Sequence, residues 1–274
     1  MTPVLKLDRV DLGYPGKPVL KDVSFGLLPG EMAGVTGPNG SGKTTLIKAA
    51  AGLIRPEKGG IFINGQNIRA MSHMERARRI AAARQSSDAP HMTVEAHTLL
   101  GRLPFFKKYQ FFETEKDRST ARKYMRLTGV LALKDKRMDE ISQGERQLAG
   151  IARALCQEPA LLMLDEPTSN LDIARQVQIL ELVDHLRKEM GMAVLTALHD
   201  LNLASEYSDR IIMVNGKTGK VRDMGAPEDA LTEDSIREVY DARVSVSRNP
   251  DSGKPRVFVK RPPAALRTPS PRSG

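Results

Sequence analysis

One short run of the sequence combines the residue types that bind a phosphate. It reads Gly37, Pro38, Asn39, Gly40, Ser41, Gly42, Lys43, Thr44 and Thr45. The glycines let backbone N–H groups approach a polyphosphate, because a Cβ atom would block the tightest points. Lys43 is placed to reach the β- and γ-phosphates, and the Thr44 hydroxyl can take a Mg²⁺ coordination position. The run predicts a phosphate-binding loop, with an ordinary strand-to-helix turn as the simpler alternative.

Two acidic residues follow a predicted strand, in a position to serve a neighbouring phosphate-binding loop. The apolar run 161–164 is typical of a buried strand, and Asp165 and Glu166 follow it directly. Beside a phosphate loop, Asp165 would hold Mg²⁺ through water and Glu166 would polarise the attacking water. A strand that ends in a solvated acidic turn is the alternative, and the neighbouring loop disfavours it. Together the two motifs imply hydrolysis of a nucleoside triphosphate.

A third motif lies between these two. Residues 141–145 read Ile-Ser-Gln-Gly-Glu and head a helical segment that runs to about Gln157. Serine and glycine at the start of a helix form an arrangement that can receive an anion.

In this order the motifs resemble those of the nucleotide-binding subunit of an ATP-binding-cassette (ABC) transporter, over nearly all of residues 4–240. The resemblance assigns Tyr14 to adenine stacking, Gln85 to the Q-loop, residues 141–145 to the signature motif, residues 169–172 to the D-loop and His199 to the switch histidine. Taken singly, Tyr14, Gln85 and His199 have simpler explanations as packing, surface and capping residues. Their order and spacing favour the functional interpretation.

The resemblance also implies a mechanism with ATP and Mg²⁺ as cofactors. Two identical chains would face each other head to tail, and each ATP would lie between the phosphate loop of one and the signature motif of its twin. The implied catalytic residues are Glu166, His199, Lys43 and Gln85. The implied Mg²⁺ ligands are Thr44, Gln85 and Asp165. The implied contacts across the dimer come from Ser142, Gln143, Gly144, Glu145 and Asp172.

The signature motif departs from the family pattern LSGGQ at Ile141, Gln143 and Glu145. Gln143 matters most, because a glycine there allows a close backbone approach or an unusual φ, and a Cβ would then cost about 1 kcal/mol. We expect Gln143 to point away from the phosphate and ATP hydrolysis to be lowered but not abolished. Gln143→Gly should recover part of the turnover in an ATPase assay, and an unchanged rate would contradict this.

The elements that must position these motifs alternate along the chain. Strand patterns at 4–12 and 18–28 predict a small antiparallel sheet, and strands at 32–36, 161–164, 193–198 and 210–214 with helices between them predict a mostly parallel one. The sequence therefore predicts an α/β P-loop ATPase of ABC type, with an antiparallel β-subdomain and an inserted helical subdomain. The expected divisions are 1–92, 93–157, 158–250 and a basic, proline-rich tail at 251–274 that is flexible from 262.

The composition and the distribution of charge disfavour some classes of function. Of the net charge of +9, eight basic residues and one acidic residue in 243–274 supply +7. The nearly neutral remainder and the absence of tryptophan disfavour nucleic acid as a partner. No apolar run is long enough to span a membrane, and nothing at the start resembles a signal peptide. We read the only cysteine, Cys156, as a buried apolar residue, and His73, His91, His97 and His185 as surface residues.

The finer resemblance lies with importers of iron-siderophore, haem and cobalamin chelates, through 101–105, 144–147 and 199–210. It implies a homodimer on the cytoplasmic face of the inner membrane, bound to separate permease subunits through the helical insert and the stretch 86–104. An extracytoplasmic binding protein would deliver the cargo, whose identity stays open between these chelates and molybdate. The alternatives are a soluble ABC-type ATPase acting on DNA or ribosomes and a non-hydrolysing ATP sensor. The basic tail is either a contact to anionic lipid or a solubilising end.

Overall fold

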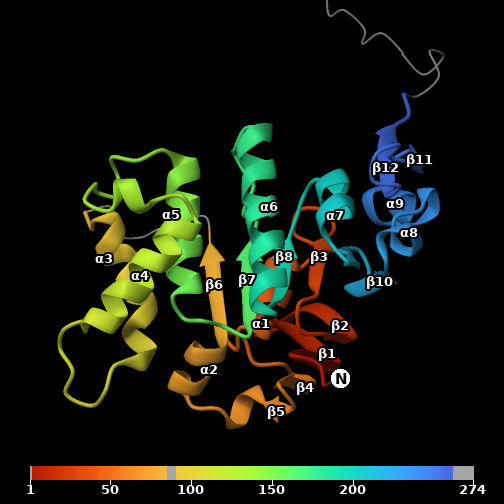
Figure 1. The fold of residues 1–274 in the computed structure, drawn as a ribbon. Helices are drawn as coiled ribbons and strands as arrows, with labels where there is room; N and C mark the ends of the chain where they lie inside the picture. Colours follow the sequence, from red (N-terminus) through yellow and green to blue (C-terminus); the bar gives the residue numbers. More distant parts are fainter. Residues whose placement is uncertain (1, 85–90, 262–274) are drawn as a thin grey trace, which may run out of the picture.

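A six-stranded sheet forms the centre of the computed structural model, which describes residues 2–84 and 91–261 (Figure 1). Its strand order is β10, β9, β3, β8, β7, β6, and all neighbours are parallel except β10 and β9. The strands are β3 Met32–Thr36, β6 Ile80–Arg84, β7 Leu161–Asp165, β8 Ala193–Ala197, β9 Arg210–Asn215 and β10 Lys220–Gly225. Strands β3 and β8 are buried along their whole length, as expected for a parallel sheet covered on both faces. The mostly parallel core sheet is confirmed.

A second, antiparallel sheet of order β2, β1, β4, β5 packs beside it. Its strands are β1 Leu5–Tyr14, β2 Lys17–Leu27, β4 Lys58–Ile63 and β5 Gln66–Asn67. The sequence predicted the first pair, and the structure adds β4, which pairs with β1 through Leu5 and Ile63. The small antiparallel β-subdomain is thereby confirmed.

Helices connect the strands of the core. They are α1 Lys43–Ala50, η1 Ile68–Ala70, α2 His73–Arg79, α6 Ile173–Met190, α7 Leu201–Tyr207, α8 Pro227–Ala230 and α9 Glu233–Tyr240. Helix α1 ends at Ala50, and Gly52, just beyond its C-cap, has the left-handed conformation that is common after a helix. Within the described ranges, none of the helices is both long enough and apolar enough to cross a bilayer.

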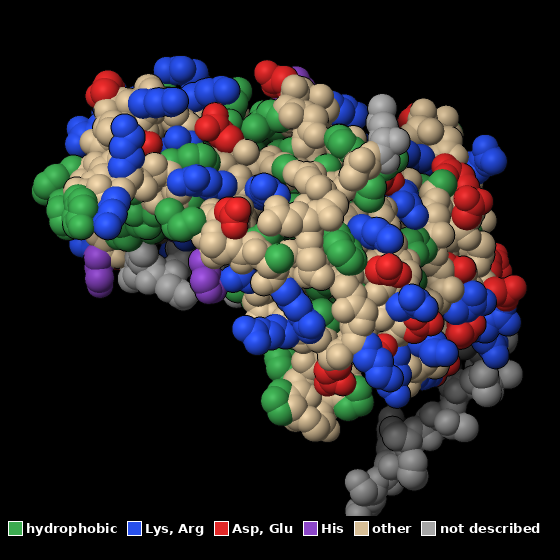
Figure 2. Space-filling view, turned by 90° about the horizontal axis from the view of Figure 1, so that it is seen from below, with side chains coloured by type: hydrophobic (Ala, Val, Ile, Leu, Met, Phe, Trp, Pro, Cys, Tyr) green, Lys and Arg blue, Asp and Glu red, His purple; other side chains and the backbone are tan. Residues whose placement is uncertain are grey.

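The helical subdomain projects from the core as a separate lobe, at the left of Figures 1 and 2. It contains α3 Val94–Leu99, η2 Leu100–Phe105, α4 Glu115–Leu127, η3 Leu131–Leu133 and α5 Gln143–Leu155. The inserted helical subdomain is confirmed, with Pro104 inside η2, Gly129 just after α4 and Ser142 capping α5.

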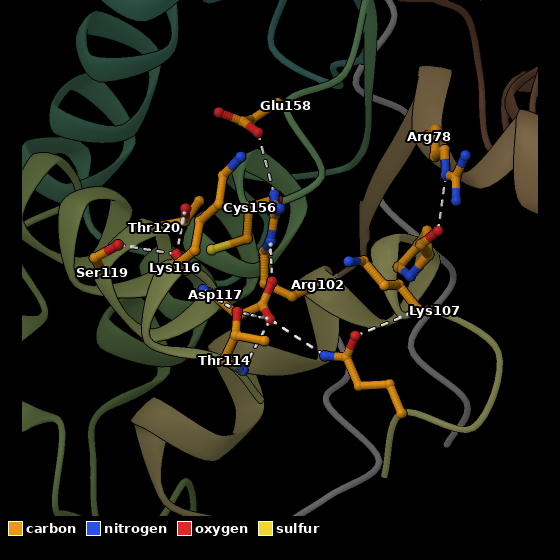
Figure 3. A network of polar contacts seen from close by, with 12 residues as sticks. Arg78, Arg102, Lys107, Thr114, Lys116, Asp117, Ser119, Thr120, Cys156 and Glu158 are labelled. Atoms are coloured by element: carbon orange, nitrogen blue, oxygen red, sulfur yellow. Dashed lines mark hydrogen bonds and ion pairs between the residues drawn. The ribbon is translucent and has the colours of Figure 1, made fainter. Parts of the chain in front are cut away.

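A buried ion pair holds this lobe together (Figure 3). The Arg102 side chain is 4% exposed, and its Nε lies 3.1 Å from Asp117 Oδ1. Arg102 Nη1 donates to the Cys156 carbonyl oxygen at 2.7 Å and to Glu158 Oε2 at 3.1 Å. Since one arginine joins η2, α4 and the end of α5, it fixes the three elements relative to one another. Cys156 is buried as predicted, and burial raises the pKa of its thiol to about 12.

One of the four histidines predicted at the surface lies inside this lobe. His97 is 1% exposed on the buried face of α3, beside Val94 and Thr98. Neither ring nitrogen has a hydrogen-bond partner among the described residues. Burial, aided by the nearby charge of Arg153, lowers the pKa of His97 to about 4. The surface prediction for His97 is therefore wrong, because α3 packs this face against α5.

His97 makes folding stability depend on pH. Its folded pKa of about 4 lies below its ordinary value of 6.5, so stability is greatest above pH 6.5 and falls as the pH drops toward 4. Between pH 7.5 and 5 this group should remove about 2 kcal/mol from the free energy of unfolding. His97→Leu should flatten the pH dependence of urea unfolding by about that amount. Equal pH dependence in the variant and the parent would contradict the assignment.

The basic end of the chain begins in ordered structure. Strands β11 Val244–Arg248 and β12 Pro255–Val259 form a hairpin in which Val244 pairs with Val259 and Val246 with Val257. Asn202 on α7 accepts a hydrogen bond from Val257 N at 2.8 Å, so the hairpin is tied to the core. Six of the eight basic residues counted from position 243 thus lie in or beside this hairpin, and the segment 262–274 lies outside the described residues.

Candidate functional site

The predicted phosphate-binding loop connects β3 to α1 at the carboxyl end of the core sheet. Gly37, Gly40 and Gly42 have φ values of 150°, 76° and 109°, which side chains with a Cβ rarely adopt. A Cβ on Gly37 would lie 2.5 Å from the Val214 carbonyl oxygen, and one on Gly42 would lie 2.9 Å from Val19. Conformation therefore favours glycine at all three positions, and the lack of space adds to this at Gly37 and Gly42.

Helix α1 starts with unsatisfied N–H groups. Helices α2 to α7 and α9 are capped by a serine, threonine or aspartate side chain, whereas Gly42 offers α1 none. The first turn of α1 also carries no acidic residue. The N–H groups and the positive end of the helix dipole are left to receive an anion.

Lys43 is the first residue of α1 and is only 4% exposed. Its Nζ donates to the carbonyl oxygens of Gly37 at 2.9 Å and Pro38 at 3.1 Å, so the loop wraps around the ammonium group. Burial lowers the pKa of Lys43, and the nearby carboxylates of Glu166 and Asp165 oppose that shift. A buried cation beside uncapped helix N–H groups favours a polyanionic ligand.

A pocket of about 260 Å³ opens over this loop. Its lining residues are Tyr14, Lys17, Val19, Asn39, Gly40, Gly42, Lys43, Thr44, Thr45 and Glu166. Tyr14, at the end of β1, is 42% exposed, so its ring is accessible for stacking. Sequence reasoning missed Lys17 and Val19, because only the pairing of β1 with β2 brings them to the loop.

Strand β7 delivers the two predicted carboxylates to the same place. Glu166 Oε1 lies 2.6 Å from His199 Nε2, and Glu166 Oε2 accepts a hydrogen bond from Ser169 Oγ at 3.2 Å. His199 comes from the segment between β8 and α7, because β8 pairs in parallel with β7. Glu166 has a φ of 55°, a strained conformation for a residue with a side chain, and such strain is concentrated at functional sites.

Two of the three residues predicted to hold Mg²⁺, Thr44 and Asp165, are in contact with each other. Thr44 Oγ1 donates to Asp165 Oδ1 at 3.2 Å, which places a hydroxyl and a carboxylate together at the start of α1. Hard oxygen ligands of this kind suit Mg²⁺, which is usually held by one or two protein groups with water and phosphates. No group of three or more His, Cys, Asp or Glu in the described part of the chain is arranged to bind a metal. Gln85 lies outside the described residues.

The signature motif forms the start of α5. Ser142 caps the helix by accepting from Glu145 N at 3.3 Å, and Glu145 Oε2 accepts from Ser142 N at 2.7 Å. This hydrogen bond also lowers the pKa of Glu145. Gln143 is the first helical residue and is not among those with positive φ. Of the two reasons given for a glycine at this position, the unusual φ does not apply to Gln143, and the close backbone approach remains as the reason.

Asp172 caps α6 by accepting a hydrogen bond from Arg175 N at 2.9 Å. The aliphatic part of Arg175 lies 3.6 Å from where a Cβ on Gly144 would be, which brings α6 next to the signature motif. Neither Asp172 nor residues 142–145 line the phosphate pocket of the same chain. The structure thus assembles the loop, Asp165, Glu166 and His199 in one place and leaves the signature motif apart.

Comparison with known proteins agrees with this architecture. The family model described as "ABC transporter" matches residues 20–169. A cobalamin import ATP-binding protein of Halobacterium salinarum is 38% identical over 91% of the chain, and the ferric enterobactin transport ATP-binding protein of Escherichia coli K12 is 34% identical over 92%. The chain spans 62% of the first relative's length and 93% of the second's.

A solved structure gives the same fold. The ATP-binding cassette MJ0796, in a dimeric post-hydrolysis state bound to ADP and phosphate, superposes with a TM-score of 0.70 at 26% identity. The match covers 81% of this chain and 98% of that one.

Proposed function

Because the chain belongs to the ABC transporter family, we propose that it binds and hydrolyses ATP to drive a membrane importer. The observation that carries the proposal is the meeting of Lys43, Glu166 and His199 at the uncapped start of α1. These groups supply the phosphate contact, the base and its partner that triphosphate hydrolysis needs.

The phosphates of ATP would lie along the loop. The N–H groups at the start of α1 and the Lys43 Nζ would donate hydrogen bonds to the β- and γ-phosphate oxygens. The Tyr14 ring would stack on adenine at the mouth of the pocket. Thr44 and Asp165, with Gln85, would hold Mg²⁺, which neutralises charge on the phosphates when bound.

Glu166 would act as the general base. Its carboxylate lines the pocket and is held by His199 Nε2 and Ser169 Oγ, a position from which it would orient a water for attack on the γ-phosphate. His199 would hold the γ-phosphate and the water. Ser169 adds a contact that sequence reasoning did not assign to this base.

A second copy of the chain would complete the site. The Ser142 hydroxyl uses its oxygen to cap α5, which leaves its hydrogen free to be donated, and the Gly144 N–H lies in the unpaired first turn. Both would donate to the γ-phosphate held by the twin, with Gln143, Glu145 and Asp172 beside them. The contacts are lost when the γ-phosphate leaves, so hydrolysis would release the dimer.

Separate permease subunits would bind at the face formed by α1, α2 and η2. A pocket of about 280 Å³ lies there between the end of α1, α2 and β6. Apolar side chains are exposed by Leu53 just after α1, Met74 on α2 and Leu103 on η2. Arg78 Nε connects α2 to η2 by donating to the Pro104 carbonyl oxygen at 2.8 Å. Helix η2 belongs to the helical insert through which the sequence predicted the permease contact, and residues 86–90 of the predicted stretch 86–104 lie outside the described residues. Gln85 would connect this face to the nucleotide.

The named relatives support import of a metal chelate, of the cobalamin or iron-siderophore type, over action on DNA or ribosomes. The subunit would then lie on the cytoplasmic face of the membrane, and an extracytoplasmic binding protein would act on it only indirectly, through the permease.

The test is to co-purify the chain with its permease and add binding proteins loaded with different chelates. One of them should stimulate ATP hydrolysis. If none does while the ATPase is active, import of a chelate is contradicted.

A further inference from the structure

The most exposed aromatic cluster of the described chain belongs to neither the site nor the permease face. It lies in residues 106–114, here called the aromatic loop, which connects η2 to α4 at the lower left of Figure 1. The side chains of Tyr109, Phe111 and Phe112 are 79%, 80% and 79% exposed. A cluster of large apolar side chains this open to water marks an interaction surface.

The aromatic loop is held open by its own contacts (Figure 3). Gln110 accepts a hydrogen bond from Lys107 N at 3.1 Å and donates to the Phe112 carbonyl oxygen at 3.0 Å. At its end, Thr114 Oγ1 donates to Asp117 at 2.7 Å, and Asp117 is paired with the buried Arg102. The aromatic side chains therefore face outward on a fixed base.

Positive charge surrounds these rings. Lys107 and Lys108 lie within the loop, and Lys108 Nζ is 5.2 Å from the centre of the Tyr109 ring. The exposed basic residues from the loop to the end of α4 are Lys107, Lys108, Lys116, Arg118, Arg122, Lys123 and Arg126. Glu113 and Glu115 oppose them within the same segment, and Glu95 on α3 pairs with Arg122 at 3.4 Å, which leaves an excess of four positive charges. Figure 2 shows Lys and Arg gathered on this lobe beside apolar side chains.

We propose that the aromatic loop and the basic face of α4 bind the surface of a bilayer that contains anionic lipid. Aromatic rings beside lysines are the combination found at membrane–water interfaces, where the rings enter the headgroup region and the cations pair with lipid phosphates. The location rests on the proposed function. The loop follows η2, whose Leu103 belongs to the proposed permease face, so it would lie next to the membrane beside the permease.

The chain contains no tryptophan, so one can serve as a specific reporter. Phe112→Trp should show a blue-shifted emission with vesicles of phosphatidylcholine and phosphatidylglycerol in equal parts, and brominated lipid should quench it. Phosphatidylcholine alone should give little shift, because the basic residues then lack a partner. The matched control is Phe258→Trp on β12, a half-exposed aromatic next to Arg256 at the opposite end of the molecule. Its emission should not shift.

The double change Phe111→Ser and Phe112→Ser should lower vesicle affinity by roughly tenfold, and Lys107→Gln with Lys108→Gln by a similar factor. Both variants should keep their affinity for Mg-ATP, so failure here is distinguishable from failure of the proposed function. The proposal is overturned if Phe112→Trp does not shift with anionic vesicles, or if its emission responds only to the purified permease. It is also overturned if binding depends on residues 262–274 and not on the loop.

Discussion

Glu166→Gln is expected to lower the rate of ATP hydrolysis by roughly a hundredfold to a thousandfold, because an amide cannot accept the proton of the attacking water. ATP binding should survive, since Glu166 is not among the groups that hold the phosphates. Because ATP is then bound but not hydrolysed, the closed dimer should accumulate, in which the signature motif of one chain covers the nucleotide of its twin. Size-exclusion chromatography with Mg-ATP should show a dimer that the parent forms only transiently.

Glu145→Gln is the matched control for this variant. It makes the same chemical change at the start of α5, where glutamine can keep the capping hydrogen bonds to Ser142. Hydrolysis by this control should stay within a few-fold of the parent rate. If Glu166→Gln hydrolyses ATP as fast as the parent does, Glu166 is not the base.

Lys43→Ala is expected to lower the affinity for Mg-ATP by roughly a hundredfold, because hydrogen bonds from a buried ammonium to phosphate oxygens are lost. The measurement is titration calorimetry with Mg-ATP. The carbonyl oxygens of Gly37 and Pro38 lose their donor in this variant, so its unfolding transition should be recorded alongside.

Lys48→Ala provides the comparison, since Lys48 lies in the last turn of the same helix and does not line the pocket. Its affinity should match that of the parent. Equal affinity in Lys43→Ala and the parent would mean that the buried ammonium does not contact the nucleotide.

The parts of the site that local chemistry determines could be predicted from the sequence. The glycines of the phosphate loop are required by φ, and Gly37 and Gly42 also by space. The run 161–164 is wholly apolar, which predicted a buried strand. Asp165 and Glu166 then had to emerge at its carboxyl end, beside the loop that follows β3.

Other features depend on contacts between segments far apart in the chain. The pairing of β4 with β1 and of β6 with β7 gave no local signal strong enough to predict. The burial of His97 depends on the packing of α3 against α5, and the only local signal for it is the helical spacing of His97 with Val94 and Gly101, which are buried as well. Likewise, the sequence alone does not show that the valines of β11 and β12 lie opposite one another, because they come together only when the two strands pair as a hairpin.

The central claim is that a triphosphate and its magnesium ion bind in the pocket over α1. The most direct measurement is calorimetric titration of the purified chain with ATP, in the presence and absence of Mg²⁺. One saturable site per chain, strengthened by Mg²⁺, is the predicted result. Absence of any affinity for Mg-ATP, both alone and with the permease bound, would contradict it.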